Sequence, residues 1–343
     1  MSNFTNKKNV VTVGRGSAAI YMALKNEGLI NKKVLVPANI CYAAVLPIIL
    51  SGNTPVFCDV DPFTGNITLD IVKKLPPVEA AVIPHMYGNT IEKINDITTY
   101  LHSIGAIVIE DCASALGARI DNRFAGDFGD YAVFSFGHSK TVELGNGGIL
   151  ATDKEVDGIN ALIKDLPPYT DQIGDNCETF SKLYRVLRNN PNKFWQRCVY
   201  DGLIKNAASM FLYDIDNELK KEIILKAETS EEIISKRRDA VKIYDSLIGY
   251  NDKLKRYRFN EGASPWRFNI YVDPIIRKQL IDCLLDKNIA VSDWYPAVTD
   301  IFNVDEVFEG TEYSQARILN FPLLIEKGQI KHIADTINSF FEG

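Results

Sequence analysis

Short apolar runs alternate with amphipathic stretches through the first half of the chain, and this alternation constrains the fold more than any other feature. Five of the runs are strand-like and read "NVVTVG", "KVLVPA", "PVFCDVD", "EAAVIPH" and "AIVIED". Helix-like segments such as "SAAIYMALKNEG" and "TIEKINDITTYLHSIG" separate them. Strands that are apolar throughout are typical of parallel sheets covered on both faces. We therefore predict an α/β fold with a mostly parallel, seven-stranded-type sheet flanked by helices.

The alternation stops near residue 153. The runs "DYAVFSF" and "GGILAT" are separated only by the short loop that contains Lys140, so two strands follow each other without a helix. Residues 154–225 have a less regular pattern, which predicts a loop over 166–179 and mixed helix around it.

The last third of the chain has a strand and helix pattern of its own. A capping box at residues 229–232 predicts the start of a helix that ends at Gly249. Strands are predicted over 266–273 and 289–296, with a helix between them and a final helix over 327–343. We therefore expect a large domain over residues 1–229 and a small α+β domain over residues 230–343.

Composition excludes several classes of function. The chain has a net charge of −6, and its Lys and Arg residues are scattered, which argues against a nucleic-acid-binding surface. No run of about eighteen apolar residues is present, so we expect no membrane span. Because no N-terminal signal pattern is seen either, we expect a cytoplasmic protein. The six cysteines form no CxxC pair and the four histidines are dispersed, so no metal site is predicted.

Four segments place polar groups beyond the carboxyl ends of the strands, where open α/β sheets bind ligands. In "VGRGSAA", a glycine turn before a helix makes a seat for an anion. Asp111 ends the strand "AIVIED", Lys140 follows Ser135 in the loop between two strands, and "PANICYAA" begins a helix near the same crevice. Each segment also has a structural interpretation, because serine N-caps, capping carboxylates and solvated loop lysines are common.

The four segments together fit one cofactor, pyridoxal 5′-phosphate. Its phosphate needs a helix N-terminus and hydroxyl groups, its pyridine nitrogen needs a carboxylate, and its aldehyde needs a lysine with which to form a Schiff base. None of the segments is specific alone, but their conjunction in this order is specific.

These segments carry a resemblance to the DegT/DnrJ/StrS family of nucleotide-sugar aminotransferases, which are fold-type I pyridoxal-phosphate enzymes. The resemblance runs from "GRGSAAIYMAL" through "VPANICYAAVLPIILSGNTPVFCDVD", "IPHMYGNT", "IEDCASALGA" and "AGDFGDYAVFSF" to "GNGGILAT". It resumes more weakly in "EEIISKRRDAVKIYDSL" and around "WYP".

The resemblance implies a role for each matched position. Lys140 matches the lysine that forms the internal aldimine, and Asp111 matches the partner of the ring nitrogen, so these two are the expected catalytic residues. Ser114 stands where the family usually has Gln or His, and Cys41 or its neighbour Tyr42 stands where an aromatic usually stacks on the ring. The expected cofactor-binding residues are Gly16, Ser17, Ala18, Cys41, Asp111, Ser114, Ser135 and Lys140.

The implied activity is transamination of a nucleotide-linked keto sugar, with glutamate as the amino donor, in polysaccharide biosynthesis such as that of O-antigen. Two alternatives stay open: another pyridoxal-phosphate reaction on a nucleotide sugar, such as deoxygenation or dehydration, and a non-catalytic regulatory relative. Known deoxygenating relatives replace the lysine by histidine, whereas Lys140 is present here. We also expect a homodimer, in which "FSKLYRVLRNN" and "FWQRCVYDGLIKN" of residues 154–225 cover one flank of the partner's cofactor.

Some residues near these motifs have two interpretations. Arg15 could contact the phosphate or form a surface salt bridge, and we favour the salt bridge. For a set of residues in the small domain, which would cover the site in this fold, we favour packing in an aromatic core. These residues are Trp266, Arg267, Trp294 and Tyr295.

Overall fold

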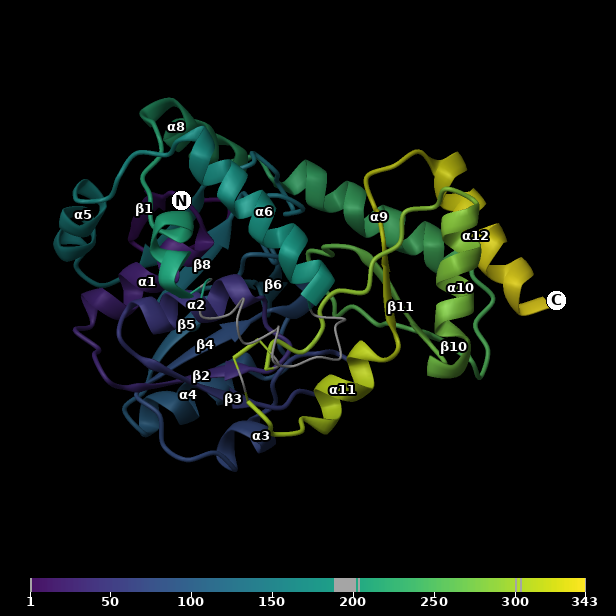
Figure 1. Ribbon diagram of the computed structural model, residues 1–343, viewed down its shortest axis with the longest axis horizontal. Coiled ribbons are helices and arrows are strands. Elements are labelled where there is room, and N and C mark those ends of the chain that lie inside the picture. The colour runs from purple at the N-terminus through teal and green to yellow at the C-terminus, as the bar shows by residue number, and fades with distance from the viewer. Residues whose placement is uncertain (1, 188–201, 203, 300, 303, 343) are drawn as a thin grey trace.

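The computed structural model describes every residue except 1, 188–201, 203, 300, 303 and 343 (Figure 1). Its main sheet has seven strands in the order β1-β9-β8-β5-β4-β2-β3. All neighbouring pairs are parallel except those that β9 makes with β8 and β1. The strands are β1 (Asn9–Val13), β2 (Lys33–Pro37), β3 (Thr54–Cys58), β4 (Ala80–Pro84), β5 (Ile107–Asp111), β8 (Tyr131–Ser135) and β9 (Gly148–Thr152). The predicted mostly parallel seven-stranded sheet is therefore confirmed.

Helices cover both faces of this sheet because its strands are apolar on both sides. Val34 and Val36 of β2 pack on one face against α1 (Gly16–Asn26), α2 (Tyr42–Leu50) and α5 (Asp157–Lys164). Leu35 between them packs on the other face against α3 (Leu69–Lys73) and α4 (Ile94–Ser103), and α8 (Asn217–Glu228) extends that layer over β8 and β9. Short strands β6 (Arg119–Ile120) and β7 (Arg123–Phe124) form a separate hairpin.

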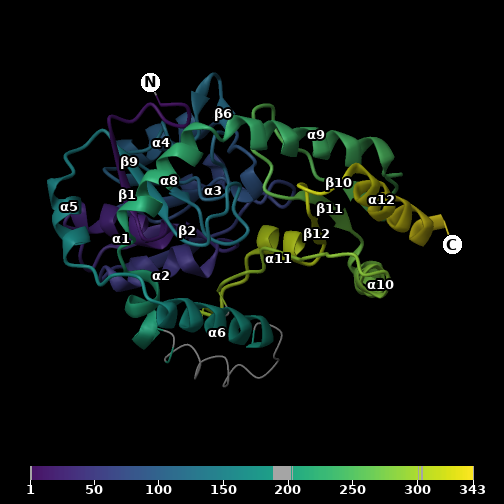
Figure 2. The same cartoon turned by 90° about the horizontal axis from the view of Figure 1, so that it is seen from above.

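A second, antiparallel sheet lies toward the C-terminus, in the order β10-β11-β12. Its strands are β10 (Leu254–Arg256), β11 (Phe268–Val272) and β12 (Ile318–Phe321). It forms its own apolar core with α9 (Glu231–Leu247), α10 (Pro274–Asp286) and α12 (Lys327–Glu342). Figure 2 shows this unit beside the large sheet, with α11 (Glu309–Gln315) between them.

Helix α9 joins the two units. Its first turn contacts the large unit, where a Cβ on Gly117 would lie 2.4 Å from Ile234 Cδ1. Its later residues belong to the core of the second sheet (Figure 1). The domain boundary at residues 229 and 230 stays a prediction.

Two local element predictions were wrong. Residues 289–296 form no strand, because only Ser292 bridges to β12, at Asn320. The buried apolar run of β12 supplies the third strand instead. The predicted loop over 166–179 is partly helical, since α6 (Asp171–Leu187) begins inside it.

The predicted capping box does not form. The Thr229 and Ser230 hydroxyls donate backward to carbonyls of α8, at Leu225 and Ala227, and no side chain caps α9. Among the described residues, no helix combines the length and apolar character needed to cross a membrane.

Candidate active site

The carboxyl ends of β5 and β8 and the first turn of α1 meet at one edge of the main sheet. Gly16 begins α1 beside Ser135, the last residue of β8: a Cβ added to Gly16 would lie 3.2 Å from Ser135 Cβ. Ser17 and Ala18 follow in the same turn and are buried. The residues predicted to bind the phosphate are therefore neighbours in space.

The helix begins one residue before the helix-like segment that starts at Ser17. Arg15 is the N-cap residue of α1, and no side chain caps the helix. Gly148 of β9 closes the turn from behind, because a Cβ there would lie 2.7 Å from the Gly16 nitrogen. An N-terminus without a side-chain cap, in a turn this narrow, presents backbone N–H groups and a positive dipole end to an anion.

Among the described residues, Arg15 does not form the surface salt bridge that we favoured. Its Nη1 lies 3.1 Å from the Met210 carbonyl oxygen and 3.3 Å from Cys177 Sγ. Its guanidinium lies 4.4 Å from the ring centroid of Phe211. The side chain therefore packs under α6 and the helical residues 204–211, where apolar and polarisable groups surround the charge.

Asp111 and Lys140 interact electrostatically. Burial raises the pKa of the Asp111 carboxyl, and the positive charge of Lys140 opposes that rise. Asp111 accepts a hydrogen bond from the Ala113 N–H at 2.9 Å. Burial also raises the pKa of the Cys41 thiol, again against the charge of Lys140. Cys41, Asp111 and Lys140 are thus close enough to interact electrostatically, although they come from β2–α2, β5 and the β8–β9 loop.

Tyr42 points elsewhere. Its ring centroid lies 4.9 Å from that of Phe180 and 4.8 Å from that of Tyr184, so the Tyr42 ring packs against α6. Cys41, the N-cap residue of α2, is the member of the pair that faces Asp111 and Lys140.

The C-terminal unit contributes to the same site. Burial raises the pKa of the Tyr295 hydroxyl, Cys41 and Asp111 add to this rise, and Ser114 opposes it. Its ring lies 5.5 Å from that of Trp266. The buried Arg237 of α9 donates to the carbonyl oxygens of Lys140 and Thr141. Sequence reasoning missed Arg237, although an arginine between Ile234 and Val241 on the apolar stripe of α9 was a usable signal.

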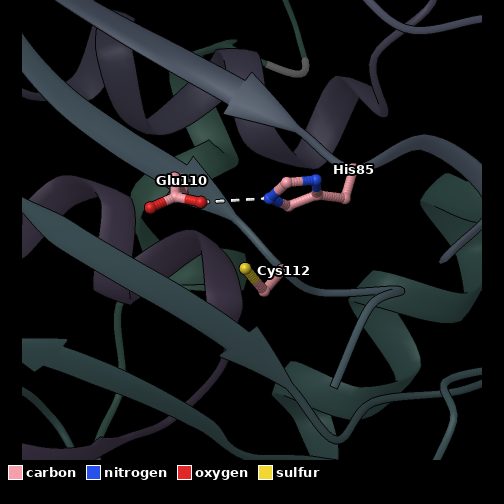
Figure 3. Close-up of side chains that lie close together, drawn as sticks. All are labelled: His85, Glu110 and Cys112. Atoms are coloured by element: carbon pink, nitrogen blue, oxygen red, sulfur yellow. Dashed lines mark hydrogen bonds and ion pairs between the residues drawn. The ribbon is translucent and has the colours of Figure 1, made fainter. Parts of the chain in front are cut away.

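A second group of titratable residues lies on the opposite face, at the end of β4 and β5 (Figure 3). Glu110 is fully buried and lies 3.1 Å from His85 Nε2. His85 Nδ1 accepts from the Ile91 N–H, so this nitrogen carries no proton and Nε2 donates to Glu110. Glu110 also accepts from the N–H groups of Gly126, Phe128 and Gly129.

Glu110 is saturated by these bonds. Burial alone would raise its pKa, but the hydrogen bond from His85 and those from the backbone N–H groups outweigh burial and hold the pKa below its ordinary value. Cys112 Sγ lies close enough to His85 and Glu110 for a metal site. A metal there would have to replace hydrogen bonds already made in a fully buried pocket, so the geometry indicates a structural cluster.

The first 162 residues match the model of the DegT/DnrJ/EryC1/StrS aminotransferase family. The chain is similar to GDP-perosamine synthase of Escherichia coli O157:H7, with 25% identity over 96% of this chain and 85% of that protein. It is also similar to dTDP-4-dehydro-2,3,6-trideoxy-D-glucose 4-aminotransferase of Saccharopolyspora spinosa, with 27% identity over 98% and 85% of the two chains.

The fold has solved counterparts. NtdA from Bacillus subtilis, whose structure was solved with bound cofactor PMP, superimposes with a TM-score of 0.72. The match covers 97% of this chain and 74% of that one, at 18% identity, and it concerns the fold alone.

Proposed function

The chain belongs to the DegT/DnrJ/EryC1/StrS aminotransferase family, and we propose that it transfers an amino group to a keto sugar carried on a nucleotide. The enzymes of this family depend on pyridoxal 5′-phosphate. The observation that carries the proposal is the electrostatic interaction of Lys140 with the buried Asp111, together with the approach of Ser135 to the first turn of α1.

The residues of this site fit the cofactor. A Cβ at Gly16 would fill the space against Ser135, so glycine leaves room for a phosphate in the turn. We propose that Gly16, Ser17, Ala18 and Ser135 hold this phosphate. Asp111 would hold a proton at the pyridine nitrogen, and its raised pKa reflects a buried carboxylate that gains from such a cationic partner. Cys41 and Ser114 would line the ring.

When bound, the cofactor supplies an aldehyde for the amines and a ring that accepts electrons. Lys140 is the amine of this site, and we propose that its Nζ takes the proton from the α-carbon of the amino donor. The same nitrogen would return a proton to the carbon that receives the amino group. Asp111 would keep the ring nitrogen protonated through both steps.

Glutamate as the donor and a nucleotide keto sugar as the acceptor are both part of the proposal. The relatives named above act on GDP-linked and dTDP-linked sugars, which supports the class of acceptor. The presence of Lys140 favours transamination over deoxygenation. A role in O-antigen synthesis and a cytoplasmic location stay predictions.

We further propose a homodimer that uses α6. Leu183 and Val186 lie three residues apart on this helix and are 46% and 69% exposed, so together they present an apolar contact to a partner. The remainder of the predicted covering segment, at residues 188–201 and 203, lies outside the described residues.

The activity is tested by incubating the holoenzyme with glutamate and a panel of nucleotide-linked keto sugars, followed by mass spectrometry. We expect 2-oxoglutarate and an amino sugar in equal amounts from at least one acceptor. We also expect glutamate alone to release one equivalent of 2-oxoglutarate, as two-stage kinetics require. A deoxygenated product, or no product with any acceptor, would contradict the proposal.

A further inference from the structure

The loop that carries Lys140 is fastened at three consecutive carbonyl groups. Trp266 Nε1 donates to the Ser139 carbonyl oxygen. Arg237 Nη2 lies 3.3 Å from the Lys140 carbonyl oxygen and 3.2 Å from that of Thr141. Both donors come from beyond residue 230, so they lie far from the loop in sequence.

The hydrogen bonds that the loop makes within itself do not use these three carbonyl groups. Glu143 accepts from His138 Nδ1 and from the Ser139 N–H, both at 2.9 Å, and the His138 side chain is 85% exposed. Leu144 donates its N–H to the Phe136 carbonyl oxygen, which closes the base of the loop. The internal bonds thus shape the loop but leave the peptide groups on either side of Lys140 without a fixed position.

The Arg237 side chain donates its hydrogen bonds to backbone carbonyl groups. It is 8% exposed, and its Nη1 lies 2.8 Å from the Trp266 carbonyl oxygen. Burial and the nearby charge of Arg267 lower its pKa to about 10. Among the described residues, Arg237 forms no salt bridge, and its acceptors are peptide carbonyls. A planar fork of N–H groups can bridge two chain segments at once, which a lysine ammonium cannot do in the same geometry.

The second segment that Arg237 holds is itself fixed to the large unit. Trp266 donates its N–H to the Tyr87 carbonyl oxygen at 2.9 Å, and Ser264 donates to that of Gly88 at the same distance. Gly88 allows this contact, because a Cβ there would lie 1.9 Å from the Ser264 carbonyl oxygen and its φ is +76°. Arg237 therefore connects α9, the segment at residues 265–266 and the lysine loop.

We infer that Arg237 is a positioning residue for Lys140, with Trp266 as its partner. The inference rests on the proposed function, in which Lys140 must reach the cofactor and two substrate carbons. Loss of the fork leaves the Lys140 peptide free to shift relative to Asp111. A displacement of about 1 Å at a reacting group is enough for a rate loss of roughly a hundredfold.

Arg237→Gln tests the inference, with Arg238→Gln as its matched control. Arg238 is the next residue of α9 and also binds carbonyls, those of Ala263 and Gly262, but among the described residues it makes no hydrogen bond to the lysine loop. We expect Arg237→Gln to lower kcat by about tenfold or more, with a much smaller change in the KM for glutamate. Arg237→Lys should recover part of the loss, and Arg238→Gln should behave as the unsubstituted enzyme.

A second readout separates positioning from loss of structure. The visible absorption band of the holoenzyme without substrates responds to the protonation of the Lys140 nitrogen. We expect its pH midpoint to shift in Arg237→Gln and not in Arg238→Gln, at equal cofactor content. If Arg237→Gln does not fold, Trp266→Phe decides alone, because it removes the donor to Ser139 and keeps most of the ring.

The inference is overturned if folded Arg237→Gln, or Trp266→Phe in its place, matches Arg238→Gln in kcat and in the midpoint of the band. Failure of the proposed function gives a different result: Lys140→Ala would then retain transamination, or the unsubstituted enzyme would show no cofactor band. The two failures are therefore distinguishable.

Discussion

Glu110 and Asp111 are consecutive residues of β5, yet they lie on opposite faces of the main sheet, and their pKa values are shifted in opposite directions. Glu110 accepts from His85 and three backbone N–H groups, and its pKa is lowered. Asp111 accepts from the Ala113 N–H, and its pKa is raised by burial. A carboxylate that the chain satisfies stabilises the fold, whereas a buried carboxylate left with few donors is available to a ligand.

The largest effect is expected on the Asp111 face, at Lys140. Lys140→Ala removes the amine that we propose moves the proton, and we expect transamination to fall by at least about a thousandfold, within the range known for general acid–base groups. The cofactor should still bind through the α1 turn, without a bond that borohydride can fix. Turnover near that of the unsubstituted enzyme in a coupled glutamate assay would contradict this role.

Asp111→Asn should lower the rate by about a hundredfold, the scale of one preorganised electrostatic partner. The same substitution should leave the free energy of unfolding of the apoprotein unchanged or raise it. Because the pKa of Asp111 is raised in the folded chain, its ionised form lowers the free energy of unfolding above that pKa, and this penalty disappears as the pH falls below the ordinary Asp value. The apoprotein of Asp111→Asn should therefore be at least as stable as the unsubstituted one at neutral pH, as measured by urea unfolding.

Agreement between the two apoproteins at low pH is the second half of this prediction. An unchanged rate with full cofactor content would instead assign Asp111 to the fold.

Glu110→Gln tests the other face. We expect the free energy of unfolding to fall by about 3 kcal/mol at neutral pH, because the amide replaces a carboxylate oxygen that accepts buried N–H groups. The pKa of Glu110 is lowered in the folded chain, so its contribution is present above the ordinary Glu value and is lost as the pH falls through the folded pKa. The difference from the unsubstituted protein should accordingly narrow in acid.

The control for Glu110 is Glu232→Gln, which removes an exposed partner of Lys236 on α9 and should leave stability unchanged. A Glu110→Gln variant as stable as this control would remove the distinction between the two faces.

The smallest effect is expected at Gly16. An added Cβ would lie 3.2 Å from Ser135 Cβ, so Gly16→Ala narrows the proposed phosphate seat. We expect the cofactor dissociation constant to rise by about tenfold, which corresponds to ~1.4 kcal/mol of crowding. Gly328→Ala, where an added Cβ meets open space, is the control in the same absorbance titration. Equal constants for the two variants would place the phosphate elsewhere.

Sequence patterns were sufficient for the main sheet, whereas the roles predicted for the site residues stay predictions. The strands are largely apolar runs; Asp111 is the last residue of β5 and Lys140 lies in the loop after β8, so local signals predict both groups at one edge of the sheet. The small sheet was harder, because "IAVSDWYP" has strand-like composition and yet crosses toward Tyr87, whose hydroxyl accepts from the Tyr295 N–H.

The difference in hydrogen bonding between Glu110 and Asp111 could not be predicted from the sequence. Alternation along β5 separates the two side chains, but the donors to Glu110 come from His85 and from the turn at residues 126–129, which only the tertiary fold brings together. The buried Arg237 depends in the same way on a contact between α9 and the Lys140 loop. Hydrogen-bond satisfaction is a property of the folded chain.

The central claim is that the Asp111 face holds the cofactor, with Lys140 as its attachment. The most direct test is borohydride reduction of the holoenzyme, followed by proteolysis and mass spectrometry of the peptides. The account predicts one pyridoxyl phosphate group per chain, on the peptide at Lys140, and none in the Lys140→Ala variant. Labelling of a different lysine, or a holoenzyme with no reducible bond, would contradict it.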